Sequence, residues 1–434
     1  MTLLFENCTV LCMTPGEPEP FRGWVGIDGR RIALVTRDRG EADAFRAAHP
    51  GLRCIDAAGK LLMPGLIDTH CHAGMTLQRC YADDLSLMSW LNDYIWPFEA
   101  RQSAGDVMLG TELGVAELLL GGVTSFVDMY WHEDRNVEVV RRMGIRAMLG
   151  VSYFDTNVKE AMRTLPAAME AARGCDRIRI AAAPHAPYTV SPENYVRGKR
   201  FCDEHGLHFM THAAETAEET RIVRERYGKS PVAHLDALGV LDDRTIAAHC
   251  VHVSDEDIAT LVRRGVAVSH NPQSNMKLAS GTAPVERMRR EGALVTIATD
   301  GPCSNNDLDM WEEMRTAALL QKSATGDPCA MPAEEVLRMV TVNSARALGW
   351  GDELGVIREG ALADVILIDL QKPHFQPVHR LAADLVYCGK AADVETVVVD
   401  GEIVVENRRV LHTDLARLFR DAEAAVRRIT ACRG

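Results

Sequence analysis

Short, almost uninterrupted apolar runs alternate with longer stretches of helical periodicity between residues 61 and 355. This alternation is typical of parallel β/α units, whose strands are covered on both faces. Eight such runs can be counted, and they begin near Leu62, Gly122, Ile145, Ile178, Leu207, Thr245, Val266 and Val295. Eight units predict an α/β fold with a closed (β/α)8 TIM barrel, in which reactive groups gather at the carboxyl ends of the strands. A doubly wound open sheet fits less well, because no Gly-x-Gly-x-x-Gly sequence follows the first strand.

The two ends of the chain show another pattern, in which short β-branched and apolar runs are separated by turn residues. Asp400-Gly401 stands between two such runs and is a strong hairpin signal. We therefore expect residues 1–60 and 356–434 to form one small composite β-sandwich domain. Residues 61–355 would form the barrel, which is the predicted catalytic domain.

Composition narrows the class of ligand. The chain has 434 residues, 47% hydrophobic and 25% charged, and a formal charge of -13, so a general attraction to nucleic acid or anionic membrane is not expected. A small-molecule substrate is the better expectation. The sequence has no apolar run of eighteen residues and no basic segment at its start, which predicts a cytoplasmic protein without a membrane span.

Candidate chemistry lies at the predicted strand ends. The first strand ends with His70 and His72, whose side chains point to the same side because alternate strand residues do. Four more strands end in ionisable groups, at His185, His212 with Glu215 close behind, His249 and Asp300. Taken singly, His185 could be a turn residue, His249 a satisfied core histidine and Asp300 a helix cap. Their joint occurrence at corresponding strand ends favours one catalytic site.

Three imidazoles and one carboxylate, from His70, His72, His212 and Asp300, predict a site for one divalent metal with a position open for water. Such a metal lowers the pKa of its water from about 15.7 toward about 7. Glu215 is expected to act as acid or base, His249 to hydrogen-bond the water, and Asp300 to accept its proton. The competing interpretation places Glu215 on a solvated first helical turn.

These residues, with the motifs in which they stand, resemble the amidohydrolase superfamily and most closely its 5-methylthioadenosine/S-adenosylhomocysteine deaminase branch, with its chlorohydrolase-like relatives. The motifs that carry the resemblance are residues 63–72, 81–84, 95–99, 183–190, 212–215, 269–281 and 299–307. The resemblance implies a barrel flanked by a β-sandwich from both chain ends. It also implies Zn²⁺, or else Fe²⁺, on the four ligands named above. A second metal is not expected, because strand four ends in Ala-Pro-His without the lysine that bridges two metals in related barrels.

The implied reaction converts a 6-aminopurine nucleoside to its inosine analogue and ammonia. Glu99 would bind the ribose hydroxyls and His185 a purine ring nitrogen, while Glu215 protonates N1 of the ring. Trp90 and Ser304, which stand in or beside the matching motifs, complete the implied substrate contacts. The remaining alternatives are a related hydrolase of another heterocycle (aminofutalosine, guanine, a pterin or a triazine) and a non-catalytic scaffold on the same barrel.

One departure from the family pattern bears on the substrate. Relatives that accept S-adenosylhomocysteine carry arginine after the third strand, where it can pair with the amino-acid carboxylate. Residues 148–157 contain no arginine here, Arg146 lies within the strand, and Arg163 stands on a later helix. We therefore expect adenosine, 5'-deoxyadenosine or 5'-methylthioadenosine as substrate ahead of S-adenosylhomocysteine. Association into a homo-oligomer is a further expectation.

Overall fold

A computed structural model describes residues 1–16, 19–85 and 89–431, apart from the side chain of residue 352. Eight parallel strands form the central sheet, in the spatial order β13-β12-β11-β10-β9-β8-β7-β6. They are β6 (Leu66–Cys71), β7 (Val123–Tyr130), β8 (Arg146–Tyr153), β9 (Ile178–Pro184), β10 (His208–Ala213), β11 (Thr245–His249), β12 (Ala267–His270) and β13 (Leu294–Ile297). The predicted (β/α)8 barrel is thus confirmed.

The barrel closes between its first and last strands by contacts near their carboxyl ends. Cys71 forms a parallel bridge with Asp300, just beyond β13, and the main-chain N–H of Asp300 donates to the carbonyl of His70 at 2.9 Å. Lower in the barrel, the Thr69 hydroxyl lies 2.7 Å from that of Thr296. Closure therefore brings residues 70 and 300 together although 230 positions separate them in the chain.

Seven of the eight strands begin within one residue of the predicted position, and the first does not. The apolar run near Leu62 is two strands, β5 (Lys60–Pro64), which pairs with β14 and β1 in the other sheet, and β6. Gly65 separates them, and a side chain there would stand 2.1 Å from the Thr124 hydroxyl, so only glycine lets the chain pass this close to β7. The pattern did not reveal the change of sheet because both strands are buried on both faces.

The chain ends build a separate mixed sheet, as predicted. Its main path is β17-β16-β15-β14-β5-β1-β2-β3, with β4 paired to β1. The strands are β1 (Thr2–Val10), β2 (Phe21–Asp28), β3 (Arg31–Thr36), β4 (Arg53–Asp56), β14 (Val365–Asp369), β15 (Val394–Val399), β16 (Glu402–Glu406) and β17 (Arg409–Val410), with β5 between the two groups. Asp400 and Gly401, both with positive φ, join β15 to β16 in the expected hairpin. The domain limits at residues 60 and 356 stay a prediction.

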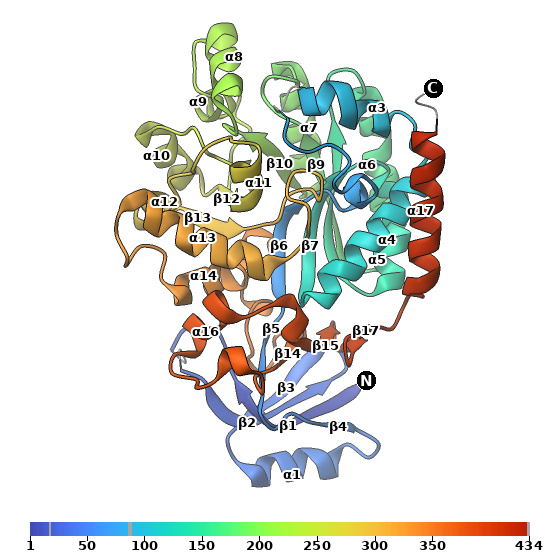
Figure 1. Cartoon of the computed structure of the whole chain (residues 1–434), viewed down its shortest axis with the longest axis vertical. Helices are drawn as coiled ribbons and strands as arrows, with labels where there is room; N and C mark the ends of the chain where they lie inside the picture. The colour runs from blue at the N-terminus through green and yellow to red at the C-terminus, as the bar shows by residue number, and fades with distance from the viewer. Residues whose placement is uncertain (17–18, 86–88, 432–434) are drawn as a thin grey trace.

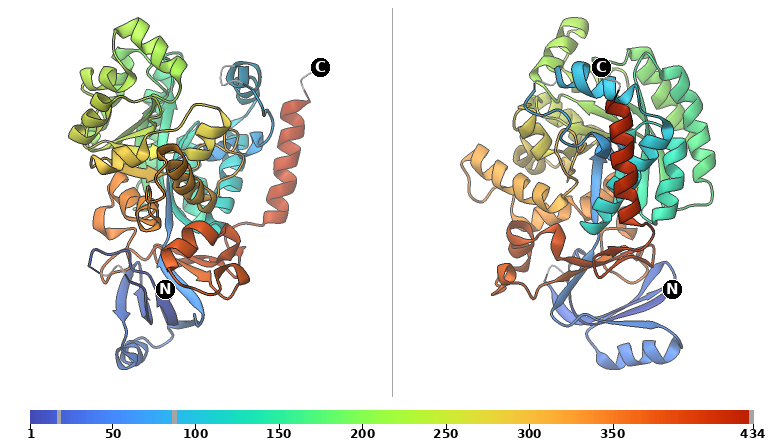
Figure 2. Two further views of the ribbon diagram at one scale, coloured as in Figure 1. Left: turned by 60° about the vertical axis from the view of Figure 1, so that its left-hand side comes forward. Right: turned by 45° about the vertical axis from the view of Figure 1, so that its right-hand side comes forward.

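Figure 1 shows this mixed sheet beneath the barrel, and Figure 2 shows the last helix lying along the outside of the barrel, where it contacts α4. The longer barrel helices are α4 (Ala104–Leu120), α5 (Glu133–Met143), α6 (Val158–Ala172), α7 (Pro192–His205), α8 (Ala217–Tyr227), α10 (Asp255–Arg264) and α13 (Met310–Thr325). Shorter helices are α3 (Trp96–Glu99), α9 (Pro231–Ala237), α11 (Pro272–Lys277), α12 (Val285–Arg290), α14 (Ala333–Met339) and α15 (Val342–Ala347). Outside the barrel lie α1 (Arg39–Ala48), α16 (Leu381–Cys388) and α17 (Leu415–Thr430).

Among the residues described, no helix combines the length and apolarity that crossing a membrane requires.

Candidate metal centre and active site

The barrel closure places a carboxylate between the first two histidines. Asp300 Oδ1 lies 3.4 Å from Nε2 of His70 and 3.1 Å from Nε2 of His72. His72 follows β6 directly, and its Nδ1 donates to the main-chain oxygen of Met129 at 2.7 Å. This hydrogen bond leaves the lone pair of His72 on Nε2, the atom that faces Asp300.

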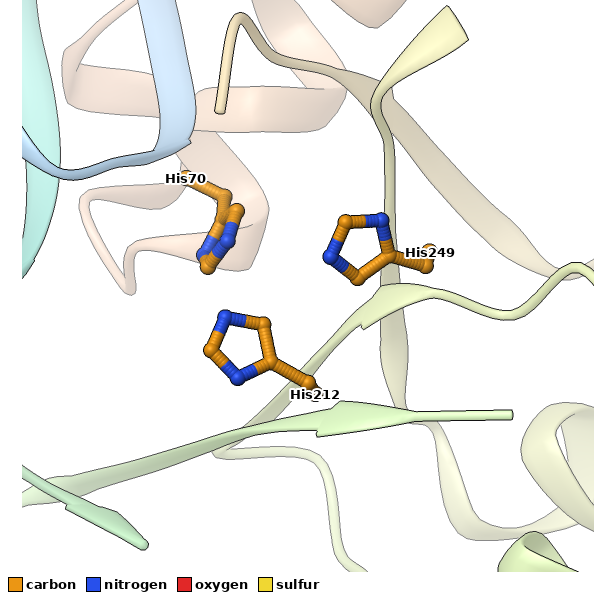
Figure 3. Close-up of side chains that lie close together, drawn as sticks. All are labelled: His70, His212 and His249. Atoms are coloured by element: carbon orange, nitrogen blue, oxygen red, sulfur yellow. The ribbon is translucent and has the colours of Figure 1, made fainter. Parts of the chain in front are cut away.

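Two further histidines come from the neighbouring ends of β10 and β11. Figure 3 shows the rings of His70, His212 and His249 gathered around one point, and one ring nitrogen of each lies within 4.8 Å of the others. His70, His72 and Asp300 form an overlapping group by the same measure. Nδ1 of His212 donates to the carbonyl of His185 at 2.8 Å, so its Nε2 also carries the lone pair.

The chemical state of these groups suits a divalent cation. His70 Nε2 is buried without a hydrogen-bond partner in the protein, which is costly unless something else binds it. Burial lowers the pKa of His70 to about 4 and that of His212 well below its usual value, so both rings are neutral at pH 7. Burial alone would raise the pKa of Asp300, but the neighbouring rings of His70 and His72 hold it well below the usual range. Neutral imidazoles beside a carboxylate are ligands that zinc and ferrous iron accept.

An inner cavity of about 90 Å³ opens above this cluster. Every residue predicted for the site lines it except His70, which lies beneath with 2% of its surface exposed. The predicted residues in the lining are His72, Trp90, Glu99, His185, His212, Glu215, His249, Asp300 and Ser304. The structure therefore brings the whole predicted set together, while the role of each member stays a prediction.

Glu215 lies in the short loop between β10 and α8, and not on the solvated helical turn of the competing interpretation. Its side chain lines the cavity, and burial raises its pKa. His249 Nε2 lies 4.0 Å from Glu215 Oε2 and 4.0 Å from Asp300 Oδ2. An imidazole between two carboxylates can receive and return protons on either side.

The backbone at these strand ends is strained. Ala214, His249 and Asp300 have φ values of 53°, 73° and 64°, in the left-handed region that non-glycine residues seldom adopt. Main-chain hydrogen bonds hold two of these positions, since the carbonyl of Ala214 accepts from Val251 and the N–H of Asp300 donates to His70. Strain of this kind persists only where the surroundings impose it, and here it aims side chains into the cavity.

Glu99 and His185 also line the cavity. The Tyr130 hydroxyl donates to Glu99 Oε1 at 2.7 Å, while burial raises the pKa of Glu99. His185 Nδ1 lies 2.8 Å from the Thr189 hydroxyl, and burial lowers the pKa of His185 to about 3. A neutral ring and a carboxylate, both partly buried, are groups that can hydrogen-bond a polar heterocycle and its hydroxyls.

Several residues at the site were not predicted from the sequence. Trp131 and Phe154 follow β7 and β8, two of the three strands for which no ionisable end was predicted, and both line the cavity. Ser274, within the motif of residues 269–281, donates to Asp300 Oδ2 at 2.6 Å, and Ser304 donates to the same atom at 3.1 Å. The position of the two aromatic residues at strand ends could have indicated them. They were not predicted because their side chains are not ionisable.

Comparison with known proteins agrees with this geometry, since the sequence model of the Amidohydrolase family matches residues 61–404. The chain belongs to the amidohydrolase family. Within it, the chain is 42% identical to a 5'-deoxyadenosine deaminase of Methanosarcina mazei, over 99% of this chain and 98% of that protein. It is 43% identical to a 5-methylthioadenosine/S-adenosylhomocysteine deaminase of Desulforudis audaxviator, over 99% of both. Among solved structures, an adenosine deaminase from Xanthomonas campestris with bound zinc superposes with a TM-score of 0.94, at 36% identity, over 99% of this chain and 98% of that one. The family predicted from the motifs is thus confirmed.

Proposed function

We propose that this amidohydrolase is a metal-dependent deaminase that converts 6-aminopurine nucleosides to their inosine analogues and ammonia. The observation that carries the proposal is that Glu215 and His249 line one cavity beside the neutral imidazoles of His70 and His212 and the ionised carboxylate of Asp300. One divalent cation would be bound by His70, His72, His212 and Asp300. We expect Zn²⁺ ahead of Fe²⁺. The zinc in the similar adenosine deaminase structure supports that order.

When bound, the cation supplies Lewis acidity that makes a water molecule reactive near neutral pH. The chain supplies the proton transfers. Glu215, whose pKa burial raises, donates a proton to N1 of the ring, which makes C6 electrophilic. Asp300 and His249 accept one proton of the attacking water and pass it to the amino group, which leaves as ammonia. The second water proton leaves the C6 oxygen as the carbonyl forms and returns to Glu215. One water is consumed, and the carbon–nitrogen bond at C6 is replaced by a carbon–oxygen bond.

The other cavity residues would bind and orient the nucleoside. Glu99 would accept hydrogen bonds from the ribose hydroxyls, and neutral His185 would hydrogen-bond a purine ring nitrogen. Trp90 and the Ser304 hydroxyl, which also lies against Asp300, complete the proposed contacts. The names of the relatives, deaminases of 5'-deoxyadenosine and of methylthioadenosine, support an adenine nucleoside as substrate.

The proposal can be tested with a panel of purine nucleosides. Conversion of adenine to hypoxanthine is monitored by the change in absorbance, and metal content is measured on the same sample. We expect turnover of adenosine, 5'-deoxyadenosine or 5'-methylthioadenosine, loss of it with a chelator, and recovery on adding Zn²⁺. Ammonia release from guanine, a pterin or a triazine, without reaction of any adenine nucleoside, would contradict the substrate class. Absence of stoichiometric zinc or iron, together with no turnover after zinc is added, would favour the scaffold.

A further inference from the structure

A second, larger cavity of about 580 Å³ adjoins the inner one. Trp96, Glu99, Trp131 and Phe154 line both, so the two spaces share one boundary. The other residues of this outer chamber are Ala100, Gln102, Val107, His132, Asp155, Thr156, Asn157 and Thr189. If Glu99 binds the ribose, as proposed above, the outer chamber receives the group attached to the sugar. Its volume is that of an ordinary ligand pocket and exceeds what a bare ribose requires.

The wall of the outer chamber carries negative charge. Its lining, all of it within the described residues, includes the carboxylates of Glu99 and Asp155 and neither lysine nor arginine. Asp155 Oδ1 accepts hydrogen bonds from the N–H and hydroxyl of Ser191, both at 2.9 Å, and from the Asn194 amide at 2.7 Å. These bonds outweigh partial burial and keep the pKa of Asp155 below its usual value. The carboxylate is therefore ionised and held in place near neutral pH.

The arginine of the strand that precedes Asp155 does not offset this charge. Arg146 lies in β8, and its guanidinium is buried against Asp364, with two hydrogen bonds of 2.9 Å, and against Asp400 at 3.2 Å. Asp364 directly precedes β14 and Asp400 lies in the β15–β16 hairpin, and neither is among the residues that line the chamber. A substrate carboxylate in the chamber would find neither lysine nor arginine among the lining residues, whose one basic ring is the imidazole of His132.

Aromatic rings form the boundary between the two cavities. The ring centroids of Trp131 and Phe154 are 5.8 Å apart, those of Trp96 and Phe154 are 6.3 Å apart, and Phe154 lies 4.4 Å from His185. Thioether sulfur packs favourably against aromatic rings, and aromatic faces attract cations. This boundary therefore suits a 5'-thioether with an apolar or positively charged end.

We propose that the outer chamber is a 5'-substituent site that accepts apolar and ammonium-bearing thioethers of adenosine and discriminates against carboxylates. The proposal rests on the proposed deaminase function. Phe154 provides the aromatic wall and Asp155 the fixed negative charge, at the positions that directly follow β8.

The test compares kcat/KM of the zinc-loaded enzyme for four substrates: 5'-deoxyadenosine, 5'-methylthioadenosine, 5'-(3-aminopropylthio)-5'-deoxyadenosine and S-adenosylhomocysteine. We expect the methylthio and aminopropylthio compounds to equal or exceed 5'-deoxyadenosine, and S-adenosylhomocysteine to fall at least about tenfold below them. Asp155→Asn keeps a side-chain acceptor for Ser191 but removes the negative charge. It should lower the ratio of kcat/KM for the aminopropylthio substrate to kcat/KM for the methylthio substrate about threefold. The effect is small because an exposed ion pair contributes less than about 1 kcal/mol. Glu160→Gln, an exposed position on α6 with the same change of charge, should leave the ratio unchanged.

Thr156→Arg adds the missing cation and should raise kcat/KM for S-adenosylhomocysteine alone. Equal kcat/KM for all four substrates, or a preference for S-adenosylhomocysteine in the unaltered enzyme, would overturn the chamber's role and leave the deaminase function intact. An unchanged aminopropylthio ratio in Asp155→Asn would remove the role of that carboxylate. Failure to convert any adenine nucleoside would instead overturn the proposed function, and this inference with it.

Discussion

The carboxylate of Glu219 accepts the main-chain N–H of Glu215 at 2.8 Å. Its other oxygen accepts the N–H of Ala214 at 2.9 Å, so one side chain from the first turn of α8 holds the loop that carries Glu215. Glu219 has 2% of its surface exposed and does not line the inner cavity. It is a positioning residue that holds the backbone from which the proposed proton donor projects.

Glu219→Gln should lower kcat for adenosine by about tenfold while metal content stays the same. A glutamine offers one acceptor oxygen for the two N–H groups, and an unsatisfied buried donor costs about 1–3 kcal/mol. Steady-state kinetics and metal analysis provide the check, with Glu218→Gln on the exposed side of the same helix as the control. A kcat equal to that of the unaltered enzyme would show that the loop holds its shape without this contact.

Glu215→Gln should retain its metal but lose turnover by about 100-fold or more, because a glutamine cannot donate the proton that N1 requires. The four proposed metal ligands are unaltered in this variant. Rates under saturating nucleoside, together with zinc content, provide the measurement. A near-normal rate would refute the role assigned to Glu215.

Folding stability should depend on pH through Glu219. Burial, with a contribution from Glu215, raises its pKa from 4.5 to about 7 in the folded state. The folded state therefore binds more protons than the unfolded state between pH 4.5 and 7, so the free energy of unfolding falls as pH rises through that window. A shift of this size corresponds to roughly 3 kcal/mol. Urea unfolding from pH 5 to 8 should show a shallower decline in Glu219→Gln than in the unaltered protein, and parallel curves would contradict the assignment.

Arg146→Met should lower the free energy of unfolding by about 3–5 kcal/mol, because it leaves the buried carboxylate of Asp364 without its partner. Asp400 loses a second contact at the same time. Arg173→Met removes an exposed pair with Glu170 and should cost less than about 1 kcal/mol. Chemical denaturation of both variants provides the measurement. Equal stability of the two variants would show that the barrel and the mixed sheet do not depend on this contact.

Much of the barrel could be predicted because parallel strands leave a local signature. A strand covered on both faces is apolar along its length and ends where polar residues begin, which located seven strands to within one residue. The first run was misread where β5 passes into β6, since two successive buried strands look the same whether they belong to one sheet or two. Trp131 and Phe154 were missed for a related reason, because an aromatic residue after a buried strand is equally compatible with core and with cavity.

The sequence by itself determined the (β/α)8 barrel, a composite β-domain from both chain ends and the set of strand-end groups, since each follows from local periodicity and residue type. Only the tertiary structure decided that Asp300 lies between His70 and His72, that Glu219 holds the Glu215 loop, and that Asp155 faces a chamber without lysine or arginine in its lining. The physical reason is that barrel closure and the paths of the loops join residues far apart in the chain. Their distances, burial and pKa shifts arise from that contact and have no signature in the local sequence.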